Sequence, residues 1–191
     1  KKKILVEKPA TVNFLKIKDI KKNYYNEDVF FAEAFTYSFH PQIIKVIELL
    51  KNNIIGKLES METFFGKNIL TKKNFFGFEK KKKIDILNRK YNKKLGGGVI
   101  LDLGCYPVSF STLIASLISK INYDKVQLIE KKKNIGITGV DIDASVDLIF
   151  ENGFKSKIYA SFSKDLGRSS KIIGSEGQLI IENTWHAKPA L

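Results

Sequence analysis

The stretch Ile4-Leu5-Val6-Glu7-Lys8-Pro9 is a short, unbroken apolar run that ends in a charged pair and a proline. Such a run is typical of the end of a buried parallel β-strand. Residues 12–24 have helical apolar spacing, and residues 29–37, rich in aromatic residues, predict a second buried strand. Strand–helix–strand units usually form right-handed crossovers in a parallel sheet. Residues 1–39 are therefore expected to be the last part of a doubly wound α/β domain.

The pattern changes after residue 40, where Pro41 fits the first turn of a helix that continues to about residue 50. An apolar stretch that ends near residue 118 predicts a further helix, in which Pro107 forces a kink or a restart. Strands are predicted at residues 57–65, 125–130, 144–150, 155–162 and 171–182. Asn152-Gly153 is the strongest hairpin signal. We therefore expect residues 40–191 to form an α+β domain with a largely antiparallel open sheet.

The chain of 191 residues is basic, with a formal net charge of +13. This balance raises nucleic acid or an anionic membrane as a partner. Arg89 and Arg168 are the only arginines, however, and the other positive charges are scattered lysines. Specific readers of bases and phosphates depend on the bidentate arginine fork. Neither nucleic acid nor a membrane is therefore the expected partner, and a basic nucleic-acid-binding module is kept as a less favoured alternative.

The cysteine and histidine content limits the site chemistry. Cys105 is the only cysteine, which excludes an internal disulfide and a cysteine-rich metal site. The two histidines, His40 and His186, are far apart in sequence, so no metal site is expected. No window approaches about eighteen consecutive apolar residues, so no membrane span is expected, and the first apolar run is too short for a secretory signal. The expected compartment is the cytoplasm.

Two short segments carry candidate chemistry. Glu7-Lys8-Pro9 stands at a strand end, where ligands collect in doubly wound sheets, and Pro9 restricts the backbone that aims Lys8. Asp102 and Tyr106, four positions apart, would lie on one face of a helix. The alternative interpretation makes Lys8 an ordinary surface residue, Asp102 a helix-terminal cap and Tyr106 a buried, hydrogen-bonded side chain.

Arg89 and the histidines are lesser candidates. Arg89 could reach a substrate from the long lysine-rich connection 68–95, but an ion pair with Asp85 is the favoured interpretation. His40 is expected to start the helix that contains Pro41, and His186 to pack with Trp185 at a sheet end.

Four segments then carry a family resemblance: residues 4–9, residues 33–42, the Gly96–Tyr106 stretch GGGVILDLGCY, and residues 174–177. In this order they resemble the Gfo/Idh/MocA oxidoreductases, the family of glucose–fructose oxidoreductase and inositol dehydrogenase. Many members have histidine at the position of Tyr106. A tyrosine there resembles the branch of glucose–fructose oxidoreductase and the dimeric dihydrodiol or xylose dehydrogenases.

The resemblance implies the domain roles and the cofactor. Residues 1–39 would be the C-terminal remnant of a dinucleotide-binding Rossmann domain, and residues 40–191 a substrate and dimerisation domain, truncated at its C-terminus. The cofactor would be NAD or NADP, contacted by Glu7, Lys8 and Pro9. Because no G-x-G-x-x-G follows a strand, the chain by itself is expected to be inactive.

The resemblance also implies a reaction: hydride transfer between nicotinamide and a sugar, polyol or related alcohol or carbonyl substrate, at a CH–OH group. Tyr106 would donate or accept the proton, Lys8 would polarise the substrate oxygen, and Asp102 would orient the substrate or accept a sugar hydroxyl. Arg89 is a further candidate for substrate binding. A homo-oligomer through the open sheet is implied too. The alternative is a non-catalytic sensor or binding protein that keeps the fold.

Overall fold

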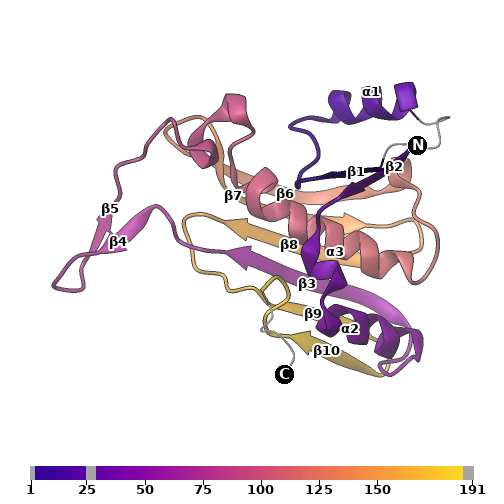
Figure 1. The fold of residues 1–191 in the computed structure, drawn as a ribbon. Helices are drawn as coiled ribbons and strands as arrows, with labels where there is room; N and C mark the ends of the chain where they lie inside the picture. The colour runs from indigo at the N-terminus through magenta and orange to yellow at the C-terminus, as the bar shows by residue number, and fades with distance from the viewer. Residues whose placement is uncertain (1–2, 25–28, 187–191) are drawn as a thin grey trace. The chain divides into compact units, whose positions relative to one another are not determined.

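The computed structural model describes residues 3–24 and 29–186 (Figure 1). Contacts between Cα atoms divide the chain into two compact units, Lys1–Thr36 and Tyr37–Leu191.

The N-terminal unit is a strand–helix–strand motif, as predicted. Its elements are β1 (Lys3–Val6), α1 (Phe14–Tyr24) and β2 (Phe30–Glu33). β1 and β2 pair in parallel, from Lys3 opposite Phe30 to Val6 opposite Glu33.

Two expectations for this unit were wrong in detail. β2 ends at Glu33 rather than near residue 37, because the chain turns into the 3-10 helix η1 (Thr36–Phe39). The strands are also more exposed than a buried parallel pair, with Leu5 72% exposed and Phe30 58% exposed. Two strands and one short helix have too little surface to cover both faces of the described pair.

The second unit is built on a six-stranded sheet in the order β10-β9-β3-β8-β7-β6. Neighbouring strands are antiparallel except β3 and β8, which pair in parallel. The predicted, largely antiparallel open sheet is therefore confirmed. Its strands are β3 (Leu58–Gly66), β6 (Gln127–Ile135), β7 (Asp141–Ile149), β8 (Lys155–Ser161), β9 (Ser170–Gly174) and β10 (Gly177–Ile181).

The Asn152-Gly153 hairpin joins β7 to β8, as predicted. Gly153 has a φ of +84°, in the left-handed region that glycine adopts without strain. The Asn152 side chain accepts a hydrogen bond from the Phe154 N–H at 3.1 Å and donates one to the Ala115 carbonyl at 3.0 Å. The turn is thereby tied to the end of a helix.

Helices α2 (Pro41–Lys51) and α3 (Cys105–Ser116) cover one face of the sheet (Figure 1). His40 is the N-cap of α2, as expected of a helix-start residue, and its Nδ1 accepts the Gln42 N–H at 3.2 Å. The core lies between these helices and the sheet. Its fully buried side chains include Ile43, Met61, Phe110, Ile114, Phe154, Phe162 and Ile172.

The predicted restart near Pro107 is a change of helix type. A short π-helix, η4 (Ile100–Gly104), runs directly into α3, and Pro107 lies in the first turn of α3. The Ser111 hydroxyl lies 2.7 Å from the Pro107 carbonyl, to which it can donate, and 2.6 Å from the Ser156 hydroxyl of β8. The helical stretch Lys93–Ser116 is long and apolar enough to cross a membrane, but half of its apolar window is buried, as in a core helix.

The connection after β3 has more structure than predicted. It contains a two-stranded hairpin and short 3-10 helices, and the hairpin projects away from the six-stranded sheet (Figure 1). These elements are β4 (Thr71–Lys73), β5 (Glu79–Lys81), η2 (Arg89–Tyr91) and η3 (Lys93–Leu95); a further 3-10 helix, η5 (Tyr123–Lys125), precedes β6.

Candidate functional site

Asp102 is a buried charge in the second unit, with 5% of its surface exposed. Its Oδ1 accepts a hydrogen bond from the Arg89 guanidinium, and its Oδ2 lies 3.8 Å from the Lys90 ammonium. The expected pairing of Arg89 with Asp85 is therefore wrong. Asp85 instead accepts the Leu87 N–H at 2.9 Å, because its side chain caps the turn that leads into η2.

The glycine run explains how Arg89 reaches Asp102. A side chain at Gly97 would place its Cβ 2.6 Å from the Arg89 carbonyl oxygen, so only glycine lets the two backbone segments lie this close. Gly98 donates its N–H to the Lys90 carbonyl at 3.0 Å and has a φ of +114°. The run folds η2 back against the start of the helix that carries Asp102.

A residue of the sheet also contacts this glycine run and the helix after it. Asp141, the first residue of β7, accepts the Ile100 N–H at 2.6 Å and so caps the π-helix. A Cβ added to Gly98 would lie 2.4 Å from the Asp141 Oδ1. Gly98 therefore gives the cap the room that it needs.

Tyr106 is half-buried within an aromatic cluster. Its ring centroid lies 6.0 Å from that of Tyr37, 5.4 Å from that of Phe65 and 5.9 Å from that of Trp185. Trp185 is in turn fixed by the hydrogen bond that its indole N–H donates to the Phe64 carbonyl at 2.9 Å. Packing therefore sets the orientation of the Tyr106 ring.

Tyr37 is a member of this cluster that sequence reasoning did not select. It is 4% exposed and donates its phenol hydrogen to the Ser109 hydroxyl at 2.9 Å. Burial raises the pKa of the Tyr37 phenol and outweighs the opposing effect of the Ser109 hydrogen bond. Tyr37 thus stays neutral at physiological pH. The aromatic Phe35-Thr36-Tyr37 segment was the signal that could have identified it.

Asp102 and Tyr106 share one continuous helical stretch, but their surroundings differ. Asp102 faces the cations of η2, whereas Tyr106 packs among aromatic rings. Between them the Cys105 thiol donates to the Leu101 carbonyl at 3.2 Å. The structure therefore joins Asp102 to Arg89 and places Tyr106 one turn further along the helix.

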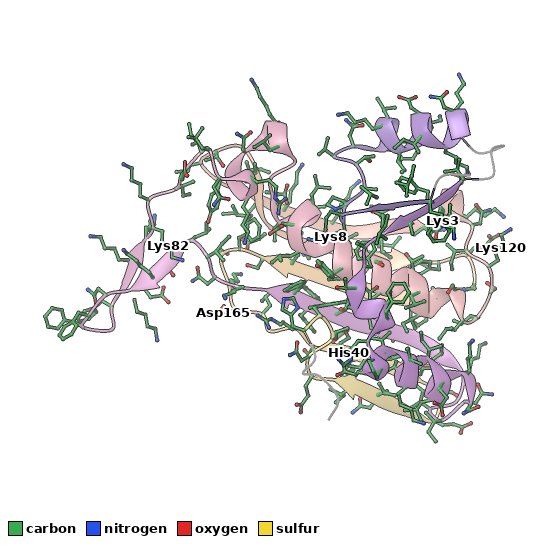
Figure 2. The ribbon with its side chains drawn as sticks, in the orientation of Figure 1. Lys3, Lys8, His40, Lys82, Lys120 and Asp165 are labelled. Carbon is green, nitrogen blue, oxygen red and sulfur yellow. The ribbon has the colours of Figure 1, made fainter. Side chains whose placement is uncertain are left out.

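In the N-terminal unit, Glu7, Lys8 and Pro9 directly follow β1. Figure 2 labels Lys8. Glu33, the last residue of β2, accepts the Ala10 N–H with its Oε1 at 2.7 Å. The carboxyl ends of the two parallel strands therefore lie together, at the edge where such sheets bind ligands. Lys8 and Tyr106 belong to different units, and their expected proximity stays a prediction.

The last candidate from the sequence, His186, packs beside an aromatic ring. His186 is exposed and lies edge-on to Phe65, with 5.8 Å between ring centroids. Across residues 3–24 and 29–186, no group of three or more histidine, cysteine or acidic side chains is placed to hold a metal ion.

The chain is similar in sequence to proteins that are named as dehydrogenases. The chain is 27% identical over 176 residues to trans-1,2-dihydrobenzene-1,2-diol dehydrogenase of Xenopus laevis, covering 92% of this chain and 47% of that protein. The mouse enzyme of that name is 27% identical over 184 residues, covering 96% of this chain and 49% of that protein. The chain thus spans about half the length of the curated relatives that it matches.

Solved structures share the fold. KijD10, a 3-ketoreductase from Actinomadura kijaniata in complex with NADP and TDP-benzene, has a TM-score of 0.75 at 18% identity, over 96% of this chain and 50% of that chain. An aldose-aldose oxidoreductase from Caulobacter crescentus complexed with glycerol has a TM-score of 0.75 at 16% identity, over 98% of this chain and 51% of that chain.

The model of the GFO/IDH/MocA C-terminal domain matches residues 43–180, which include the whole Asp102–Tyr106 segment and most of the open sheet. On this match, the chain belongs to the Gfo/Idh/MocA family of oxidoreductases.

Proposed function

We propose that this chain is part of an NAD(P)-dependent oxidoreductase that acts on CH–OH groups. It would transfer a hydride between nicotinamide and a sugar, polyol or related alcohol or carbonyl substrate. Support comes from the names of its relatives, a dihydrodiol dehydrogenase, an NADP-bound 3-ketoreductase and an aldose-aldose oxidoreductase. The structural observation that carries the proposal is the helix that holds Asp102 against Arg89 and Tyr106 within a fixed aromatic cluster.

The residues present fit one end of such a cofactor. When bound, the nicotinamide accepts or supplies the hydride. The carboxyl ends of β1 and β2 lie together, and Lys8 follows β1 there with a cationic side chain. No described segment contains G-x-G-x-x-G after a strand, so residues 7–9 are assigned to the nicotinamide end and not to the pyrophosphate.

Tyr106 is proposed to donate or accept the proton at the substrate oxygen. The ring contacts with Phe65 and Trp185 fix its orientation, and a fixed proton donor is the requirement of general acid–base catalysis. Lys8 would polarise the same oxygen, and an ammonium near a phenol stabilises the phenolate.

Asp102 and Arg89 are proposed to bind and orient the substrate. A carboxylate has about four acceptor sites, so Asp102 can accept a sugar hydroxyl besides its hydrogen bond from Arg89. The Arg89 side chain is 50% exposed and keeps donors available for substrate oxygens. The pair therefore suits a substrate with several hydroxyl groups.

The test uses the full-length protein with NAD or NADP and a panel of sugars and polyols, and follows nicotinamide absorbance. We expect turnover with at least one substrate, and slower turnover with Lys8→Met. For Lys8→Met we also expect a rise in the pH at which activity is half-maximal. The alternative, a non-catalytic sensor, predicts that the protein binds cofactor and sugar without turnover. A nucleic-acid-binding module predicts instead a salt-sensitive affinity for oligonucleotides.

We also propose that residues 1–39 are the Rossmann remnant and that residues 40–191 are the substrate domain.

We propose further that the protein is cytoplasmic and forms a homo-oligomer through the open sheet. Among the described residues, no helix of the second unit covers the face of the sheet opposite α2 and α3. It carries stacked Phe64 and Tyr159 rings, 5.0 Å apart and inclined by 8°, beside paired Lys157 and Asp147. Stacked rings and opposite charges could both pair across a two-fold axis. A monomer of the full-length protein at micromolar concentration in sedimentation would contradict the assembly.

A further inference from the structure

The β4–β5 hairpin is an ordered arm with a defined turn. Thr71 pairs with Lys81 and Lys73 with Glu79. At the turn, the Asn74 Oδ1 accepts the N–H groups of Phe76 at 3.1 Å and of Phe78 at 2.9 Å. The Asn74 side chain therefore fixes the direction of the residues at the tip.

Three phenylalanines stand at this tip and face solvent. Phe75 is 97% exposed, Phe76 is 78% exposed and Phe78 is 71% exposed. The Phe75 and Phe76 rings contact each other edge-on, with centroids 5.5 Å apart. A Cβ added to Gly77 would meet no atom within 4 Å, so the tip stands in open space. Contiguous exposed aromatic rings usually mark an interaction site.

Lysines surround the aromatic tip on both strands. Lys72 and Lys73 precede it, and residues 80–83 are four consecutive lysines, all exposed; Glu79 is the single acid of the segment 71–83. Figure 2 shows Lys82 where the arm leaves β5. The arm thus has an apolar end and a strongly basic stem.

We propose that the hairpin 71–83 docks on the surface of an anionic phospholipid bilayer. The rings of Phe75, Phe76 and Phe78 enter the boundary between headgroups and acyl chains, while the lysines contact lipid phosphates and carboxylates. This is the division of apolar and basic residues that interfacial membrane anchors use. Docking of this kind determines where the protein binds and is separate from the reaction that it is proposed to catalyse.

Charge and shape favour a bilayer over two other partners. A second copy of this chain also has a net charge of +13, so a basic arm would meet like charge. Single-stranded nucleic acid binds in basic grooves along which aromatic rings stack with the bases. Here the rings lie beyond the lysines, at the end of a projecting two-stranded ribbon.

The test is co-sedimentation of the full-length protein with vesicles of phosphatidylcholine, either pure or with about one third phosphatidylserine. We expect binding to the anionic vesicles that weakens as salt is raised, and little binding to the neutral ones. The double variant Phe75→Ser/Phe76→Ser should bind at least about tenfold more weakly. Replacing Lys80–Lys83 with glutamine should lower binding at least about tenfold as well.

Matched controls come from β6 and the loop after it. Ile137→Ser removes an apolar side chain that is 89% exposed, and replacing Lys131–Lys133 with glutamine removes a second lysine run. Both controls should bind vesicles as the parent protein does. A Phe76→Trp variant should show a blue shift of its added fluorescence on anionic vesicles, and quenching by brominated acyl chains.

Three outcomes would overturn the proposal. The first is vesicle binding by the Phe75→Ser/Phe76→Ser protein that equals the parent's. The second is a loss of oligomerisation in that variant, which would assign the tip to a second copy. The third is loss of binding to a single-stranded oligonucleotide in the same variant, with no vesicle binding by the parent. Nicotinamide-linked turnover should be unchanged in the variant, so this test and that of the proposed reaction fail separately.

Discussion

Two segments between β3 and the first turn of α3 use their residues in opposite ways. In Gly96–Tyr106 the side chains and backbone satisfy one another: Asp102 binds Arg89, Asp141 caps the helix, and Tyr106 packs among aromatic rings. In the hairpin 71–83 the large side chains contact solvent. The first segment is built to hold groups in position, and the second is built to meet another surface.

This contrast gives each segment its own experimental signature. Changes in Gly96–Tyr106 should alter turnover or folding stability, because its groups act through fixed geometry. Replacing the exposed side chains of the hairpin should alter neither, because these side chains contact solvent.

The largest expected effect is on turnover in Tyr106→Phe. The variant keeps the ring and its contacts with Phe65 and Trp185 but lacks the hydroxyl. In the full-length enzyme, turnover should fall by about 10² to 10⁴, the usual contribution of a placed general acid or base, while substrate affinity changes little. Steady-state kinetics with a responsive substrate measures both. Parent-level turnover in the folded variant would show that Tyr106 only packs.

The next effect is on stability and compares two glycines with positive φ. Gly98→Ala should lower the free energy of unfolding by about 3 kcal/mol, because alanine is strained at φ +114° and its Cβ would overlap the Asp141 carboxylate. Gly77 also has a positive φ, of +82°, but it has open space around it, so Gly77→Ala should cost only about 1 kcal/mol. Urea denaturation measures both. Equal losses would mean that the Asp141 contact contributes nothing.

A smaller effect is expected from Arg89→Met. It removes the guanidinium partner of a carboxylate that is 5% exposed, while the Lys90 ammonium stays 3.8 Å from that carboxylate. Because Arg89 itself is half exposed, the loss of stability should be only about 1 to 2 kcal/mol, below that of a fully buried pair. KM should rise more than kcat falls if Arg89 binds substrate. Arg89→Lys is the control, since it keeps the charge but not the fork.

Much of the fold was predictable because its signals are local. Pro41 starts α2, Asn152-Gly153 makes the β7–β8 hairpin, and Pro107 marks the entry into α3. Each depends on the backbone preference of one or two residues. The parallel pairing of β3 with β8 joins residues 95 positions apart, such as Ser60 and Lys155, and has no such local signal.

The site was predictable only as a set of residue types. Asp102 was identified from its spacing to Tyr106, but its partner was not, because Arg89 is brought to it by the close approach of Gly97 to the Arg89 backbone. The expected pairing with Asp85 was based on the usual solvent-exposed position of such charges. The role of Tyr37 depends on burial by Phe110 and Trp185, which come from distant segments. Whether Lys8 meets Tyr106 stays a prediction.

The smallest expected effect is on the stability of the Phe75→Ser/Phe76→Ser protein. It tests whether the exposed rings of the hairpin contribute to folding. Because both rings are largely exposed, their removal should change the free energy of unfolding by less than about 0.5 kcal/mol. Phe110→Ala is the comparison within the core: Phe110 is 0% exposed, and its loss should cost about 3 to 5 kcal/mol. Urea denaturation of the parent protein and of the two variants measures both losses. If the serine variant loses as much stability as the Phe110 variant, the tip packs against the rest of the full-length protein and is not available to a bilayer.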